Sequence, residues 1–386
     1  LVTISLMASM VLLLSIERIQ QGAEEGFNQS ISGVDAIIGP RSSSLELVLY
    51  TVFHIGRPTN NITTKTIDDI RQRNDIDWIV PIALGDSHKD FRVVATESNY
   101  FEHIKYANNK SLTLSKGKVF SELSEVVLGA DVAEKLNYIV GSNIQITHGS
   151  TESTANKHDD FLFKVSGILN KTGTPIDQVI FLDLNGYELL HLGWKSGRKV
   201  FSLDKIDLST IPKEDLNPKT LTAAFVGLKS KLTLFNFTKS IREYPNEAIS
   251  AVIPGIALSE LWSIVGLVDK GFQLLSWIII AISLIAMITL IIASLENRKH
   301  EMTIYRANGA SPRFLSGMVV YEALFIGLVA IFGAIILVSI VTYFATSQLN
   351  STLGISPTFK WISFGEVKVF SIILLAGVLS SLIPAI

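Results

Sequence analysis

The sequence predicts a membrane protein with four transmembrane helices and an α+β extracytoplasmic domain inserted between helices 1 and 2. Hydrophobic residues make up 48% of the 386 residues and mean hydropathy is +0.39, with the longest apolar runs at the two ends of the chain. The run from Leu274 to Ser294 carries no charge. As a helix it would span about 30 Å, the thickness of a bilayer core. Residues 20–271 contain no comparable run, so we expect this region to fold outside the lipid.

Residues 1–19 are predicted to form the first transmembrane helix and the start of a stalk. The apolar stretch from Val2 to Ile16 also resembles the core of a signal peptide, but no A-x-A-like cleavage site follows it. One apolar helix face continues beyond this stretch through Ile19, Ala23 and Phe27. This continuation favours an uncleaved helix that projects out of the membrane.

Residues 20–257 alternate short strand and helix patterns, which predicts an α+β domain. Two strand patterns, 78–84 and 91–96, flank the tripeptide Gly85-Asp86-Ser87. This arrangement predicts a β-hairpin that turns at the tripeptide. Residues 110–170 form a second block of strands and a helix, and they are a candidate inserted subdomain.

Residues 258–295 are predicted to form one continuous helix that serves as stalk and second transmembrane helix. Its first apolar residues recur every three or four positions and so share one face. They are Leu261, Trp262, Val265, Val268 and Phe272. We expect this stripe to pack on the stalk of residues 16–27, because neither stalk would be stable as an isolated helix. Such a helix either transmits displacement between the two compartments or merely tethers the outer domain.

The rest of the chain predicts a charged segment at 296–313, a third span at 314–345, a short outer loop at 346–366 and a fourth span at 367–386. We expect the fourth span to be truncated and the chain to be trimmed at both ends, because it begins without a methionine and stops inside an apolar run. The outer loop carries one basic residue, whereas the charged segment carries Arg298, Lys299, Arg306 and Arg313. The positive-inside rule therefore places the charged segment in the cytoplasm and the large domain outside.

The charged segment also contains a specific spacing of residues. It reads R-x-x-E and then R-A-x-G-A-S, formed by Arg298, Glu301, Arg306, Ala307, Gly309, Ala310 and Ser311. This resembles the loop after the second transmembrane helix in the FtsX/MacB superfamily of ABC transporter permeases, although Met302 or Thr303 stands where an aliphatic residue is usual. The resemblance implies that Arg298, Glu301, Arg306, Gly309 and Ala310 belong to a coupling helix that sits on a separate ATPase subunit.

Further expectations follow from that resemblance. The outer region is similar to a MacB-like periplasmic core domain, and the protein would be a multi-pass protein of the inner membrane with this domain in the periplasm. Its partners would be an ABC ATP-binding subunit, a second copy of itself or a related permease, the membrane lipid, and a candidate periplasmic adaptor or lipoprotein. ATP and Mg²⁺ would be bound by the partner subunit, so we expect no cofactor in this chain.

The implied function is that of a type VII, mechanotransmission permease. ATP binding and hydrolysis in the partner would move the outer domain, which exports or releases a peptide, a lipoprotein or a drug-like substrate. Two alternatives stay open: an FtsX-like non-transport regulator that activates a periplasmic cell-wall hydrolase, and a metal-homeostasis ABC system with a periplasmic lipoprotein. The size of the outer region argues against the FtsX branch, whose outer domain is much smaller.

Several function classes find no support in the sequence. There is no G-x-x-x-x-G-K-[ST], G-x-S-x-G, H-E-x-x-H or G-x-G-x-x-G motif, so we expect no ATPase or other enzyme activity in this chain. The absence of cysteine excludes disulfides, thiolate catalysis and cysteine zinc sites. A net charge of −2 gives no reason to expect a nucleic-acid partner.

Some polar residues allow two interpretations. Glu322 in the third span either has a functional partner at membrane depth or reaches water near the headgroups. His148 and the cluster His158-Asp159-Asp160 flank a polar loop, which we interpret as a solvated hairpin loop rather than a metal site. Asp269 and Lys270 are expected to be interfacial anchors.

Overall fold

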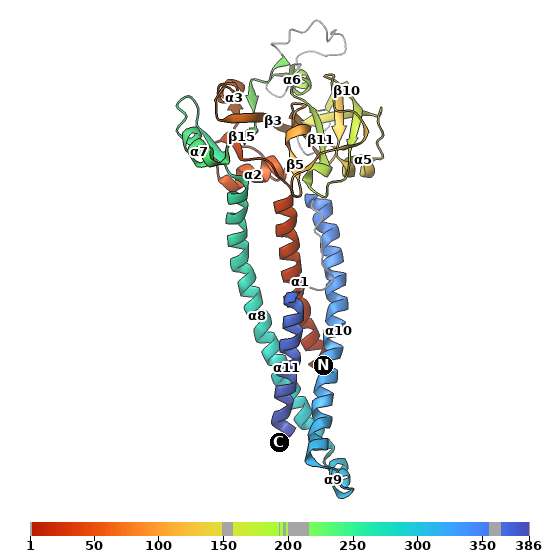
Figure 1. Cartoon of the computed structure of the whole chain (residues 1–386). Coiled ribbons are helices and arrows are strands. Elements are labelled where there is room, and N and C mark those ends of the chain that lie inside the picture. Colours follow the sequence, from red (N-terminus) through yellow and green to blue (C-terminus); the bar gives the residue numbers. More distant parts are fainter. Residues whose placement is uncertain are drawn as a thin grey trace. The chain divides into compact units, whose positions relative to one another are not determined.

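The structure is a computed structural model that describes residues 2–148, 157–192, 194–195, 198–199, 216–354 and 364–385 (Figure 1). It divides into two compact units. We call residues 25–262 and 349–356 the outer domain. The membrane unit comprises residues 1–24, 263–348 and 357–386.

The outer domain is built on a mixed sheet that has ten strands among the described residues. The strand order is β16-β1-β15-β3-β4-β11-β8-β10-β7, and β9 pairs with both β10 and β3. The strands are β1 (Ala36–Pro40), β3 (Ile76–His88), β4 (Phe91–Thr96), β7 (Leu114–Gly117), β8 (Glu125–Leu128), β9 (Asn143–His148), β10 (Lys157–Leu169), β11 (Val179–Asp183), β15 (Ala223–Leu228) and β16 (Ile249–Val252). The candidate subdomain at 110–170 thus adds its longer strands to this one sheet.

The sheet is central because helices and loops cover both of its faces. Every residue of β1, β8 and β15 is buried, which explains why these strands read as continuous apolar runs rather than alternating patterns. Neighbouring residues of β1 enter different cores, Ile38 on one face and Ile37 on the other. The β4–β11 and β8–β10 pairs are parallel, whereas β1 is antiparallel to both of its neighbours.

The helices of the outer domain are short and pack on this sheet. Helix α2 contributes Leu47 and Val48 to the same core as Ile37, and α7 contributes Phe237 and Ile241 to the core of Ile38, so these two helices cover opposite faces. The helices are α2 (Ser44–Val52), α3 (Thr64–Arg71), α4 (Tyr100–His103), α5 (Ala130–Leu136), α6 (Leu184–Leu192) and α7 (Leu234–Arg242), with 3₁₀ turns η2 (Pro175–Gln178) and η6 (Lys231–Thr233). Short strand pairs complete the domain: β2 (Ile62–Thr63) with β14 (Thr220–Leu221), β5 (Lys105–Tyr106) with β6 (Lys110–Ser111), and β12 (Trp194–Lys195) with β13 (Arg198–Lys199).

The membrane unit contains most of the long apolar helices, which are α1 (Val2–Gln29), α8 (Pro254–Asn297), α10 (Pro312–Leu353) and α11 (Phe364–Ala385), with the short α9 (Lys299–Ala307) between α8 and α10. Within the described residues, three segments are long and apolar enough to cross a membrane: Thr3–Gln29, Pro254–Asn297 and Pro312–Asn350. Helix α11 begins within the predicted outer loop and runs through most of the predicted fourth span. All four long helices contribute to one core, to which α10 brings the small residues Ala330 and Ala334.

Two predicted loops are wrong. Strand β3 continues through Gly85-Asp86-Ser87 to His88, and the hairpin turns at Lys89, whose φ is +53°. The register shifts between Leu84 and Ser87, and the extended part of β3 gains a second partner in β9, at Asp86 and Ser87. The tripeptide is therefore a bulge that bends the strand toward another neighbour, and not a turn.

The second wrong loop is the start of the predicted outer loop at 346–366, because α10 continues to Leu353. The helix ends only at Gly354, which has a φ of +66° and whose N–H binds the carbonyl of Asn350. Gln178 donates to that same carbonyl, and Pro175 lies against Gly354. This last turn of α10 is thus fixed by η2 of the outer domain.

Candidate functional site

Helix α8 is the predicted continuous rod, and it contains the whole of 258–295. Its 44 residues correspond to about 66 Å, roughly twice the thickness of a bilayer core. Pro254 stands at the first helical position, where the missing N–H costs no hydrogen bond, and no other proline interrupts the helix. Chain continuity thus carries one unbroken hydrogen-bonded ladder from the outer domain into the membrane unit.

The predicted apolar stripe on this rod divides into two parts. Leu261 and Trp262 pack against the outer-domain core, where the Trp262 ring meets the Phe27 ring edge-on at 5.6 Å. Val265 is half-buried. Val268 and Phe272 are 57% and 44% exposed. That these last two residues pack on the first stalk stays a prediction.

Polar contacts that the sequence did not predict link α1 to α8 in the membrane unit. Gln20, with its amide nitrogen turned toward Asp269, donates to both carboxylate oxygens at 2.8 and 3.0 Å. Deeper along the helices, the hydroxyls of Ser5 and Ser283 lie 2.9 Å apart. Asp269, interpreted as an interfacial anchor, thus holds two helices together.

A buried ion pair connects α1 to α11. The Arg18 guanidinium donates twice to the Glu366 carboxylate, through Nε to Oε1 and through Nη2 to Oε2 at 2.9 Å. The two side chains are only 11% and 3% exposed. The sequence places both charges at the outer ends of predicted spans, which could have suggested that they meet. No local pattern, however, predicts a contact between residues so far apart in the sequence.

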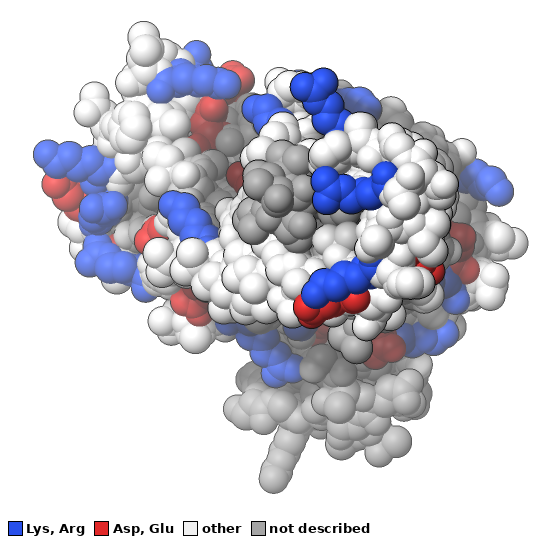
Figure 2. Space-filling model, turned by 90° about the horizontal axis from the view of Figure 1, so that it is seen from below, with Lys and Arg blue, Asp and Glu red and all other residues white. Residues whose placement is uncertain are grey.

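The predicted coupling segment forms α9, which has no buried residue. Glu301 lies in its first turn and Arg306 in its last turn, positions that suit the helix dipole. Ile304 and Tyr305 are 49% and 44% exposed. Figure 2, a view from below, shows Lys and Arg side chains together with Asp and Glu side chains on the face turned toward the viewer.

The way in which α9 ends explains why the motif has a glycine at position 309. Gly309 has a φ of +90°, and its N–H binds the carbonyl of Arg306 while the Ala310 N–H binds that of Tyr305. These two bonds form a Schellman motif. Ser311 then caps α10 through its hydroxyl, which accepts from the Phe314 N–H at 3.3 Å. Gly309 and Ala310 thus form a turn that fixes how α9 continues into α10.

Glu322 is half-buried and lines a cavity of about 670 Å³ within the membrane unit. Arg298 and Arg313 line the same cavity, whose other walls are mostly apolar. The structure thus brings one coupling residue, Arg298, together with Glu322.

The candidate metal loop lies mostly outside the described residues. Its central residues, 149–156, lie outside the described residues, as do the side chains of His148 and of the cluster 158–160. The backbones of His148 and of residues 158–160 belong to β9 and β10. Among the described residues, no group of three or more His, Cys, Asp or Glu is placed to hold a metal ion.

Comparisons with known proteins match both units of the chain. The family model for MacB-like periplasmic core domains matches residues 1–218, and the model for the FtsX-like permease C-terminal region matches residues 274–386. No curated protein matches the sequence.

Two solved structures are also similar to the chain. The periplasmic region of MacB from Actinobacillus actinomycetemcomitans is 10% identical, with a TM-score of 0.35, over 59% of this chain and 94% of that chain. The extracellular domain of the noncanonic ABC-type transporter YknZ from Gram-positive bacteria is 11% identical, with a TM-score of 0.32, over 56% of this chain and 99% of that chain.

The MacB-like match covers more than half of the chain, and it agrees with the α+β outer domain and the apolar helices described above. The predicted family and the predicted α+β character of the outer domain are therefore confirmed. The chain belongs to the FtsX/MacB-type ABC transporter permeases, membrane proteins with an extracytoplasmic domain.

Proposed function

We propose that this chain is the permease subunit that couples ATP binding and hydrolysis in a separate ATP-binding subunit to movement of the outer domain, which exports or releases a peptide, lipoprotein or drug-like substrate. The observation that carries the proposal is α8, one uninterrupted helix that begins directly after β16 and ends next to α9. A helix whose hydrogen bonds are intact transmits displacement along its axis, whereas a flexible linker does not.

The proposed topology has four transmembrane helices, with α11 as the fourth, in the inner membrane. The outer domain is inserted between α1 and α8. The basic residues of 296–313 support a cytoplasmic location for α9. The family supports assembly as a dimer, either with a second copy or with a related permease, on two ATP-binding subunits.

Helix α9 is the proposed contact with the ATP-binding subunit. Its side chains are almost all exposed, and two of them, Ile304 and Tyr305, are large and apolar. Such residues are typical of a surface that a partner covers. The rigid turn at Gly309 passes any displacement of α9 to α10.

The variant Val265→Pro tests the rod. Proline at this position removes the hydrogen bond to the Leu261 carbonyl and costs roughly 3 kcal/mol in helix stability, with a kink. We expect normal membrane levels and continued ATP hydrolysis by the complex, but loss of export or client release. Val265→Ala is the matched control, because it keeps the backbone hydrogen bond and should retain transport. If Val265→Pro still supports transport, α8 is a tether and the proposed mechanism fails.

A charge reversal tests the contact. Glu301→Lys combined with Arg306→Glu inverts the two family charges of α9 without burying either one, so the membrane unit should fold normally. We expect ATPase activity that no longer responds to the permease. The control is the pair swap Lys239→Glu with Glu243→Lys on α7, since these exposed side chains lie 4.0 Å apart in the outer domain. Full coupled activity in the α9 variant would exclude this helix as the contact.

A further inference from the structure

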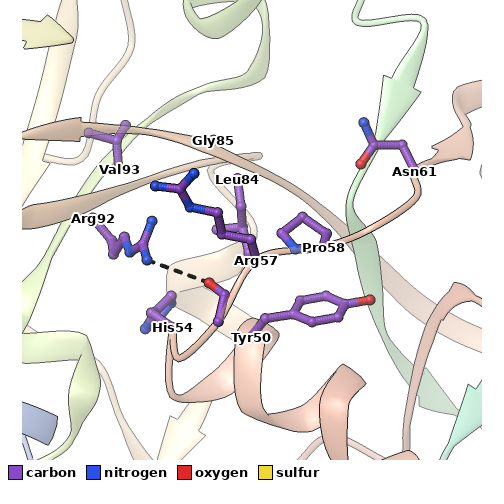
Figure 3. Close-up of a pocket in the computed structure, with 10 residues that line it drawn as sticks. Tyr50, His54, Arg57, Pro58, Asn61, Leu84, Gly85, Arg92 and Val93 are labelled. Atoms are coloured by element: carbon purple, nitrogen blue, oxygen red, sulfur yellow. Dashed lines mark hydrogen bonds between the residues drawn. The ribbon is translucent and has the colours of Figure 1, made fainter. Parts of the chain in front are cut away.

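The outer domain contains a cavity of about 240 Å³ that the proposed function does not use. It lies between the end of α2, the segment that follows α2, and the strands β3 and β4 (Figure 3). Its polar side comes from Arg57, Arg92 and His54, whereas Leu84 and Val93 contribute apolar surface. Figure 3 shows the two arginine side chains on the same side of the cavity, with His54 beside them.

The charged side chains that line this cavity are all positive. Its ten lining residues, all in the described part of the chain, include two arginines and no Asp or Glu. Arg92 is half-buried, and burial followed by the neighbouring Arg57 charge lowers its pKa. The Arg92 Nη2 reaches the Gly56 carbonyl only at 3.5 Å. The fold thus holds two like charges near each other, an arrangement that an anion between them would stabilise.

His54 adds a neutral polar group to the same wall. Burial, and then the Arg92 charge, lowers the pKa of His54 to about 4, so its ring is uncharged at neutral pH and keeps one N–H donor. Its backbone has a φ of +57°, a left-handed conformation that histidine adopts only at a cost. The segment after α2 therefore holds this ring in the cavity wall against a local backbone preference.

We propose that this cavity binds an oxyanion, the carboxylate or phosphate group of a larger ligand, between Arg57 and Arg92. Guanidinium forks match both groups through paired N–H bonds. The volume is below the roughly 300–1,000 Å³ of pockets that enclose whole drug-sized ligands. It suits one charged group with a short apolar stem against Leu84 and Val93, while the rest of the ligand stays outside.

Binding is tested on the full-length chain in detergent by saturation-transfer difference NMR, without the ATP-binding subunit, so the result does not depend on coupling. Propionate is the carboxylate probe, inorganic phosphate the competitor, and propionamide the neutral control. We expect propionate to bind with a Kd of about 1 mM, as a ligand of five heavy atoms allows, and propionamide to show no saturable signal. Displacement of propionate by phosphate at lower concentration would assign a phosphoryl ligand, and the reverse order a carboxylate.

Variants then locate the site. Arg57→Gln and Arg92→Gln should each weaken propionate binding about tenfold or more, since each removes charge-assisted hydrogen bonds. Arg242→Gln, an exposed arginine on α7 outside the cavity, should have no effect. Arg57 is itself exposed, so its variant keeps the test valid even if the Arg92 variant does not fold. Equal signals from propionate and propionamide, or full binding by Arg57→Gln, would overturn the proposal.

Discussion

The ion pair between Arg18 and Glu366 makes a quantitative prediction about the membrane unit. Both charges are buried, and the contact is bidentate, so each group satisfies the other. Removal of one partner leaves the remaining charge buried without its counter-ion. Such a change typically costs about 3–5 kcal/mol. We therefore expect Glu366→Met and Arg18→Met each to lower the free energy of unfolding by about 3 kcal/mol or more.

The double variant Arg18→Met with Glu366→Met should behave differently. It removes both charges together and fills the space with apolar side chains, a replacement that is often neutral or stabilising. The deficit of the double variant should then be smaller than that of either single variant. Lys270→Gln serves as the control, because this charged side chain lies in the same unit but is exposed.

The measurement is equilibrium unfolding of the purified chain in mixed micelles, analysed as a double-mutant cycle. The coupling energy between positions 18 and 366 should be about 3 kcal/mol, far above that of an exposed pair. Additive effects of the two single changes, or single effects as small as that of Lys270→Gln, would refute the reasoning. The pair would then contribute no more than a surface ion pair.

Three further predictions address other parts of the chain. Gly309→Ala places a side chain at a φ of +90° and costs about 1–2 kcal/mol in the stability of the turn. It should weaken binding of the ATP-binding subunit by up to about tenfold. The control Gly266→Ala, inside α8, should leave this binding unchanged. Trp262→Ala removes the contact with Phe27 and should lower the free energy of unfolding by about 2 kcal/mol in thermal melts. A decrease no larger than that caused by Phe235→Ala, at an exposed position, would contradict this prediction. Because the pKa of His54 is lowered in the folded state, the unfolded chain binds more protons than the folded chain between about pH 4 and 6.5. The free energy of unfolding should therefore rise with pH across that window, by about 1–3 kcal/mol after allowance for partial exposure of the ring. His54→Asn, which suits the left-handed backbone, should flatten this pH dependence, and an unchanged slope would exclude His54 as its source.

Local patterns in the sequence predicted most elements of the fold correctly. The α8 rod and β4 follow from short-range periodicity and from prolines and glycines that bound each element. The two errors, at Gly85–Ser87 and at residues 346–353, have one cause. In both places a partner distant in sequence decides the structure: β9 extends β3, and Gln178 binds the last turn of α10.

In the candidate site, too, local features were predicted and contacts between distant residues were not. The turn chemistry of the coupling segment is local, so Gly309 and Ala310 were identified from their motif. The contacts between helices were not, because Arg18 meets Glu366 and Gln20 meets Asp269 across hundreds of residues. An apolar stripe also cannot show which of its residues another helix covers, and Val268 and Phe272 are 57% and 44% exposed in the single chain.

The pairing of β1 with both β15 and β16 has a consequence for biosynthesis. Ala36 pairs with Val226, and Ile37 with Val252, so β1 leaves the ribosome about 190 residues before its first partner strand exists. At roughly 5–20 residues per second, this gap lasts about 10–40 s. During that time a fully apolar strand, attached to an already synthesised α1, has no sheet to join. We expect the nascent chain to need a holding chaperone on the outer side of the membrane in this interval, and its folding to finish only when β16, just ahead of the second membrane helix, has been translocated.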